Sequence, residues 1–149
     1  MENEVMKMYK RCIAEQSANR QQELEQGLLE LMGRKRYEDI TVSELCTEMN
    51  VPRKSFYRYF SGKEGALWAL IDHTLQKQVP ILTAGRSAVE SLADYFRFWQ
   101  DQKQLLDALE RSGLSGILVQ RTLALSLTSE GIRKYFPDRI ICSMLFQDG

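Results

Sequence analysis

The sequence predicts an all-α protein, and two patterns in its apolar residues carry this prediction. Apolar side chains recur every three or four residues through most of the chain, as at Leu24, Leu28 and Leu31, which is the spacing of one helical face. No segment shows the alternation of apolar and polar residues that is typical of a half-buried strand. The order of the expected helices predicts a three-helix head with a helix-turn-helix over residues 19–62, then a small helical body over 63–149.

The first helix of the head is expected over residues 19–32. Gly33 would end it, and Tyr37 and Ile40 would be core residues of the following loop. Residues 1–18 form a separate N-terminal arm, either helical or irregular, in which Lys7, Lys10 and Arg11 are diluted by acidic neighbours. The apolar stripe of the first helix consists of Leu24, Leu28, Leu29, Leu31 and Met32.

The second helix has a clear start signal at Thr41. Thr41 is a good N-cap and Glu44 follows three residues later, so the two residues are expected to form a capping box. Asn50 tolerates the left-handed backbone that ends a helix. Pro52 suits the start of the next helix because its missing N–H costs nothing there. One buried face is expected from Val42, Leu45, Cys46 and Met49.

The third helix follows a tight turn and has one apolar and one polar side. Phe56 and Phe60 lie four residues apart and are expected to pack back onto the second helix. Arginine can bond both acceptors of a guanine edge, while lysine and tyrosine reach phosphates. The helix that opens near Lys63 can add backbone N–H groups for a phosphate. The residues expected to contact duplex DNA are Thr41, Arg53, Lys54, Ser55, Tyr57, Arg58 and Lys63.

The charge distribution supports this surface better than the net charge, which is zero. Residues 34–63 contain seven basic and four acidic residues, so the segment meant to face DNA is positive. A local basic patch is what phosphate neutralisation needs. A patch alone would more often be an ordinary solvated surface, and it is the surrounding helix-turn-helix pattern that favours DNA binding.

The run VPRKSFYRYFSGKE, residues 51–64, resembles the recognition-helix signature of the tetracycline-repressor (TetR) family. Tyr57, Phe60, Lys63 and Glu64 match that signature residue by residue, and the resemblance covers roughly residues 19–78. It implies that Tyr57 and Lys63 hold phosphates and that Phe60 belongs to the core. Two positions depart from it: Pro52 replaces a usual Ser or Thr, and Lys54 replaces a frequent Gly.

The body is expected to contain a connecting helix over 63–78 that ends near Pro80, and helices over about 87–100, 103–111 and 117–129. A short terminal helix is expected over 133–146. In the family this region encloses a ligand pocket, and its last two helices form the dimer. The sequence ends about where those two helices would begin, so we expect either a naturally shortened body or a truncated one. Tyr95, Phe96 and Trp99 are candidates for the pocket of a small-molecule effector, although aromatic residues at this spacing are more often core.

Several kinds of site find little support in the sequence. The only histidine is His73, and no nucleophile motif, phosphate-binding glycine loop or metal-ligand spacing is present. We therefore expect no enzyme activity, no cofactor and no metal. Three cysteines without paired spacing favour a reduced cytoplasmic protein over a disulfide scaffold. No apolar run has the length of a membrane span.

Two functions remain. The first is a DNA-binding transcriptional regulator, expected to be a repressor that binds a pseudo-palindromic operator as a homodimer and is released by a small-molecule effector. The second is a co-regulator with the TetR fold that acts mainly through a partner protein. The dimer surface is expected C-terminal to about residue 103, and its candidate residues are Leu114, Ile117, Leu118, Leu125, Ile140, Ile141 and Leu145.

Overall fold

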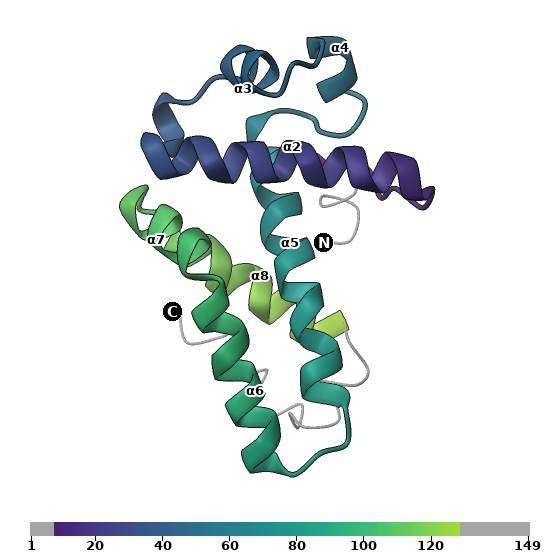
Figure 1. The fold of residues 1–149 in the computed structure, drawn as a ribbon, viewed down its shortest axis with the longest axis vertical. Coiled ribbons are helices and arrows are strands. Elements are labelled where there is room, and N and C mark those ends of the chain that lie inside the picture. The colour runs from purple at the N-terminus through teal and green to yellow at the C-terminus, as the bar shows by residue number, and fades with distance from the viewer. Residues whose placement is uncertain (1–7, 129–149) are drawn as a thin grey trace, which may run out of the picture. The chain divides into compact units, whose positions relative to one another are not determined.

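The computed structural model describes residues 8–128, which are all-α as predicted apart from an isolated bridge between Tyr9 and Phe60 (Figure 1). Contacts divide the described chain into two units, with residues 8–71 and 104–114 in unit 1 and residues 72–103 and 115–128 in unit 2. The elements are α2 (Glu15–Arg34), the 3₁₀ turn η1 (Tyr37–Asp39), α3 (Val42–Glu48), α4 (Arg53–Phe56), α5 (Lys63–Thr83), α6 (Ala88–Asp101), α7 (Lys103–Arg111) and α8 (Ser115–Thr128).

The long first helix of unit 1, α2, begins four residues before the predicted start and runs one residue past Gly33. Residues 15–18 carry no apolar periodicity, but they include Glu, Gln and Ala, which are good helix formers. Their helix propensity therefore extends α2 beyond the segment that the apolar pattern marks. Leu24, Leu28 and Met32 are buried on its inner face. The predicted apolar stripe is thus confirmed, while the predicted helix start was wrong.

Helix α3 packs closely against α2. A Cβ added to Gly27 of α2 would lie only 2.3 Å from the sulfur of Met49, so a larger residue at position 27 would force the Met49 side chain to shift. Asn50 has a φ of 52° and ends the helix in the left-handed region, as predicted. The N–H of Val51 then donates to the Cys46 carbonyl at 2.9 Å. These features make a short, fixed turn between α3 and α4.

Helix α7, apart from its first residue Lys103, belongs to unit 1, whereas the sequence analysis assigned residues 103–111 to the C-terminal body. Its bounds, Lys103–Arg111, are those predicted, and Leu105 and Leu109 are buried. The Arg111 guanidinium donates to the Gly33 carbonyl at 2.9 Å. The Ser112 hydroxyl accepts from the Tyr37 N–H at 3.1 Å. The C-terminal end of α7 is therefore hydrogen-bonded to the end of α2 and to the loop between α2 and α3.

Unit 2 contains the second half of α5 together with α6 and α8. The connecting helix was expected to end near Pro80, but α5 continues through Pro80 to Thr83. Because Pro80 lies three residues from the helix end, the backbone bond that it removes is one of the last in the helix. Ser87 and Glu90 form a complete capping box at the start of α6. The expected terminal helix over 133–146 lies outside the described residues.

None of the helices within residues 8–128 combines the length and the apolar character that a membrane span requires.

Candidate nucleic-acid interface

Helix α4 is a single turn whose conformation continues into the following residues. The N–H of Arg58 donates to the Ser55 carbonyl and that of Tyr59 to the Phe56 carbonyl, at 3.3 and 3.0 Å. Phe56 and Phe60 are buried, with ring centroids 5.0 Å apart. Their burial fixes which side of this segment faces outward. Of the residues predicted to contact DNA here, Arg53, Lys54, Tyr57 and Arg58 are exposed and Ser55 is half-buried.

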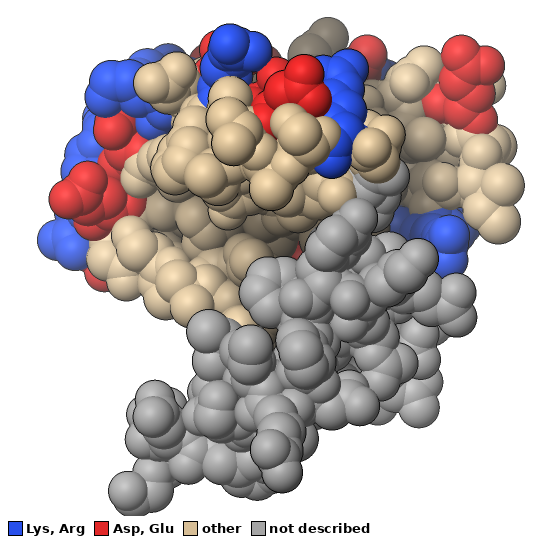
Figure 2. Space-filling view, turned by 90° about the horizontal axis from the view of Figure 1, so that it is seen from below, with Lys and Arg blue, Asp and Glu red and all other residues tan. Residues whose placement is uncertain are grey.

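The basic residues that precede α3 are held in ion pairs on the surface. Arg34 pairs with Glu48 at 2.5 Å and Lys35 with Glu44 at 3.0 Å. Arg36 likewise pairs with Glu38 at 3.1 Å. Figure 2, a view of the molecule from below, also shows basic and acidic side chains interspersed along the margin of that face. The positive patch expected across residues 34–63 is consequently narrower than the sequence suggests.

The cations of the α4 segment are arranged differently. Within residues 8–128, neither Arg53, Lys54 nor Arg58 forms an ion pair with a carboxylate. The Arg53 guanidinium carbon lies 6.0 Å from the centroid of the exposed Tyr57 ring, within reach of a weak cation–π contact. Unneutralised positive charge is therefore concentrated on the exposed side of α4, where a phosphate backbone can approach.

Lys63 has a structural role that the sequence did not reveal. Its ammonium donates to the carbonyls of Tyr37 and Ile40 at 2.9 and 2.8 Å, and it lies 4.3 Å from the centroid of the Tyr37 ring. Burial, and secondly the negative charge of Glu64, raise the pKa of Tyr37 to about 12. Lys63 thus joins the start of α5 to the loop between α2 and α3. An ammonium has three donors, so its expected phosphate contact stays a prediction.

Thr41 caps α3, but only half of the predicted capping box is formed. The Thr41 hydroxyl oxygen accepts from the Glu44 N–H at 3.1 Å. The Glu44 carboxylate accepts instead from the Lys35 ammonium, at 3.0 and 3.1 Å, and this bond holds the pKa of Glu44 below its ordinary value. Thr41 is exposed and its O–H is a donor, which is what its expected DNA contact requires.

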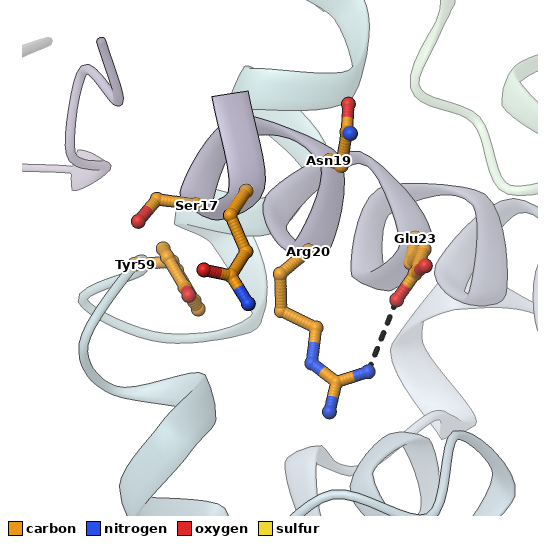
Figure 3. Close-up of a pocket in the computed structure, with 6 residues that line it drawn as sticks. Ser17, Asn19, Arg20, Glu23 and Tyr59 are labelled. Carbon is orange, nitrogen blue, oxygen red and sulfur yellow. Dashed lines mark hydrogen bonds and ion pairs between the residues drawn. The ribbon is translucent and has the colours of Figure 1, made fainter. Parts of the chain in front are cut away.

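An open polar hollow lies between the first turns of α2 and Tyr59, the residue that follows Arg58 (Figure 3). Its volume is about 530 Å³. Arg20 pairs with Glu23 at 3.1 Å in its wall. No sequence pattern indicated this hollow, because its lining joins segments some forty residues apart. The lining residues are Gln16, Ser17, Asn19, Arg20, Glu23 and Tyr59.

The three residues proposed for an effector pocket form a row along α6. Tyr95 lies edge-to-face against Phe96 and Trp99, with centroids 5.9 and 6.3 Å apart. The Trp99 indole N–H donates to the Gln78 side-chain oxygen at 3.1 Å. Phe96 is 59% exposed, so it faces solvent rather than an enclosed space. An effector site around these residues remains a prediction.

Sequence reasoning also missed the N-terminal strap, by which we mean residues Met8, Tyr9 and Lys10. The strap runs alongside residues 59–61, and Tyr9 forms the bridge with Phe60. Lys10 and Arg11, the described basic residues of the arm, are exposed, whereas Lys7 lies outside the described residues. A pairing between segments fifty residues apart leaves no local signal in the sequence.

Within residues 8–128, no three His, Cys, Asp or Glu side chains lie close enough together to hold a metal ion.

Comparison with known families bears on the helix-turn-helix directly. Residues 26–69 match the family described as bacterial regulatory proteins, tetR family. The match runs from within α2 through α3 and α4 into α5, so it contains both helices of the motif and its turn. No curated protein and no solved structure matches the chain. This segment is therefore similar to the DNA-binding part of the tetR family of bacterial regulatory proteins, which supports a DNA-binding transcriptional regulator.

Proposed function

We propose that the chain is a repressor that binds a pseudo-palindromic duplex as a homodimer, with α4 in the major groove. The observation that carries the proposal is the exposed side of α4, where Arg53, Lys54 and Arg58 form no ion pair with a carboxylate of the described chain. Such cations retain their full attraction for phosphates and base acceptors. Buried Phe56 and Phe60 oppose them and hold that side outward.

Position along the helix assigns the contacts. In a helix-turn-helix the N-terminal residues of the second helix meet base edges, while the flanking residues meet the backbone. Arg53, Lys54 and Ser55 form the first turn of α4, and we assign base contacts to them. Phosphate contacts are assigned to the flanking residues Thr41, Tyr57, Arg58 and Lys63.

The test begins by selecting a preferred duplex from a random library with the wild-type chain. We expect Arg53→Ala or Lys54→Ala to weaken binding to that duplex by about 1–3 kcal/mol, which is the value of one good base contact. Fluorescence anisotropy at fixed salt measures the loss. Binding to unselected duplexes should change less, since phosphate contacts carry no sequence information.

Arg97→Ala is the matched control, because it removes one exposed arginine from α6 in unit 2. The control should bind the selected duplex as the wild type does. Unchanged binding in both Arg53→Ala and Lys54→Ala would exclude α4 as the element that recognises bases.

The homodimer is proposed because two half-sites require two heads, and a two-fold interface uses the same surface twice. The residues expected to form it, Leu114, Ile117, Leu118 and Leu125, are half-buried, and three others lie outside the described residues. An exposed apolar face on α6, made of Val89, Leu92 and Phe96, offers a surface that the sequence analysis did not consider. These three residues share one side of the helix and suit burial against a second copy.

The co-regulator alternative has no comparable support. A protein that works only through a partner would have no need for unpaired cations on its recognition helix. Release by a small-molecule effector follows from the family's usual behaviour, and it would be tested by adding candidate apolar ligands to the complex with the selected duplex.

A further inference from the structure

The N-terminal strap is hydrogen-bonded to the segment that leaves α4. The Lys10 N–H donates to the Tyr59 carbonyl at 2.7 Å. The Met8 carbonyl accepts twice from Ser61, from its N–H at 2.9 Å and from its hydroxyl at 3.0 Å. These bonds lie on both sides of Phe60, the buried residue that ends the recognition segment. The strap therefore restrains the linker between α4 and α5.

Two further contacts fix the strap itself. The buried Gln21 side chain, 1% exposed, donates from α2 to the Lys10 carbonyl at 2.8 Å. On the other side the strap lies directly over the first turn of α5. A Cβ added to Gly65 would lie 2.0 Å from the Met8 oxygen and 3.0 Å from its carbonyl carbon. Glycine at position 65 is therefore required for the strap to remain in place.

We propose that the strap is a positioning element for DNA recognition, which holds α4 in the orientation that base contacts require. This inference rests on the proposed function of α4. The helix has only four residues, so its own backbone bonds do little to fix its direction. Its orientation depends on the buried Phe56 and Phe60 and on the connection that the strap clamps.

Base and phosphate contacts differ in how much geometry they need. A bidentate hydrogen bond to a base edge requires a fixed direction, whereas a cation attracts phosphate over several ångströms. Release of the strap should therefore reduce the preference for the selected duplex more than it reduces affinity for DNA in general. This predicted pattern separates a positioning role from a simple contribution to stability, which would not change the preference of the folded fraction.

Gly65→Ala is the decisive variant, and Gly33→Ala is its matched control. Both exchange a helical glycine for alanine, which favours each helix to a similar degree. A Cβ at Gly33 meets no atom within 4 Å, whereas one at Gly65 collides with the strap. We expect amide exchange at Lys10 and Ser61 to accelerate in Gly65→Ala alone. The ratio of affinities for selected and random duplexes should fall by at least about fivefold, the lower end of one lost base contact.

Each outcome bears on the proposal. Faster exchange at both amides with an unchanged affinity ratio would overturn the positioning role and leave the function of α4 intact. A wild-type chain that binds no duplex would overturn both proposals. Should Gly65→Ala fail to fold, Ser61→Ala decides the matter, because it removes only the hydroxyl bond to Met8. In Ser61→Ala the ratio of affinities for selected and random duplexes should fall by less than in Gly65→Ala. If amide exchange at Lys10 accelerates while this ratio stays at the wild-type value, the positioning role of the strap is overturned.

Discussion

The two units of this regulator bury different kinds of side chain. Among the side chains whose burial the structure describes (residues 8–82 and 84–125), every buried apolar one except Leu75 lies in unit 1. Unit 2 instead buries the polar residues Asp72, Thr74 and Gln78, while it exposes Val89, Leu92, Phe96 and Val119. Unit 1, which contains the helix-turn-helix, is therefore built around an apolar core, and the described part of unit 2 is not.

The difference shows how each unit is held together. In unit 1 burial of apolar area is the main source of stability. In unit 2 directed bonds are prominent: the Arg121 guanidinium donates two hydrogen bonds of 2.7 Å to the Asp72 carboxylate. Such a buried pair fixes geometry, but its net stabilisation is small because both charges lose their hydration. The exposed apolar side chains of unit 2 remain available for burial in an interface.

The largest expected effect is on the core of unit 1. Phe60→Ala should lower the free energy of unfolding by about 3–5 kcal/mol, the usual cost of truncating a buried aromatic side chain. Denaturant unfolding followed by circular dichroism measures it. Ile13→Ala, at a side chain that is 92% exposed in the same unit, should change stability by less than about 0.5 kcal/mol. Equal values for the two variants would contradict the packing of the recognition segment described above.

The ion pair of unit 2 gives the next largest effect. Asp72→Asn should cost about 3 kcal/mol in unfolding free energy, because it removes the carboxylate charge that faces the largely buried Arg121 guanidinium. The double variant Asp72→Leu with Arg121→Met should recover most of that loss, since two apolar groups need no partner. Asp94→Asn is the control, because Asp94 pairs only with exposed arginines among the described residues and exposed pairs contribute little. If Asp72→Asn unfolds as the wild type does, the charge of Asp72 is not needed to compensate the buried Arg121 guanidinium.

Unit 1 was also the part that the sequence predicted best. Thr41, Asn50 and Pro52 are local signals, since each acts through the backbone of its own neighbours. The side of α4 that faces outward followed from the spacing of Phe56 and Phe60. Local rules were enough here because the motif has short helices and one tight turn.

Features that depend on distant partners could not be predicted. The pairing of Lys35 with Glu44 replaced half of a capping box, and Lys63 was found on the carbonyls of Tyr37 and Ile40. The strap joins residues fifty positions apart. In each case a polar group forms a hydrogen bond with a residue that is distant in the sequence and comes near only in the folded chain.

The smallest effect on the folded monomer is expected on the exposed face of α6. Phe96→Ser should change the free energy of unfolding by no more than about 0.5 kcal/mol, because Phe96 is already 59% exposed. If the face of Val89, Leu92 and Phe96 joins two copies, the same change should weaken dimerisation at least about tenfold, since aromatic side chains dominate interface energies. Sedimentation across a concentration series measures this. Ile13→Ser, at a still more exposed apolar position in unit 1, should leave the dimer unchanged. A wild-type dimer that Phe96→Ser does not weaken would move the interface off α6, towards the surface beyond residue 103, and a wild-type mass of 17.3 kDa would exclude the homodimer.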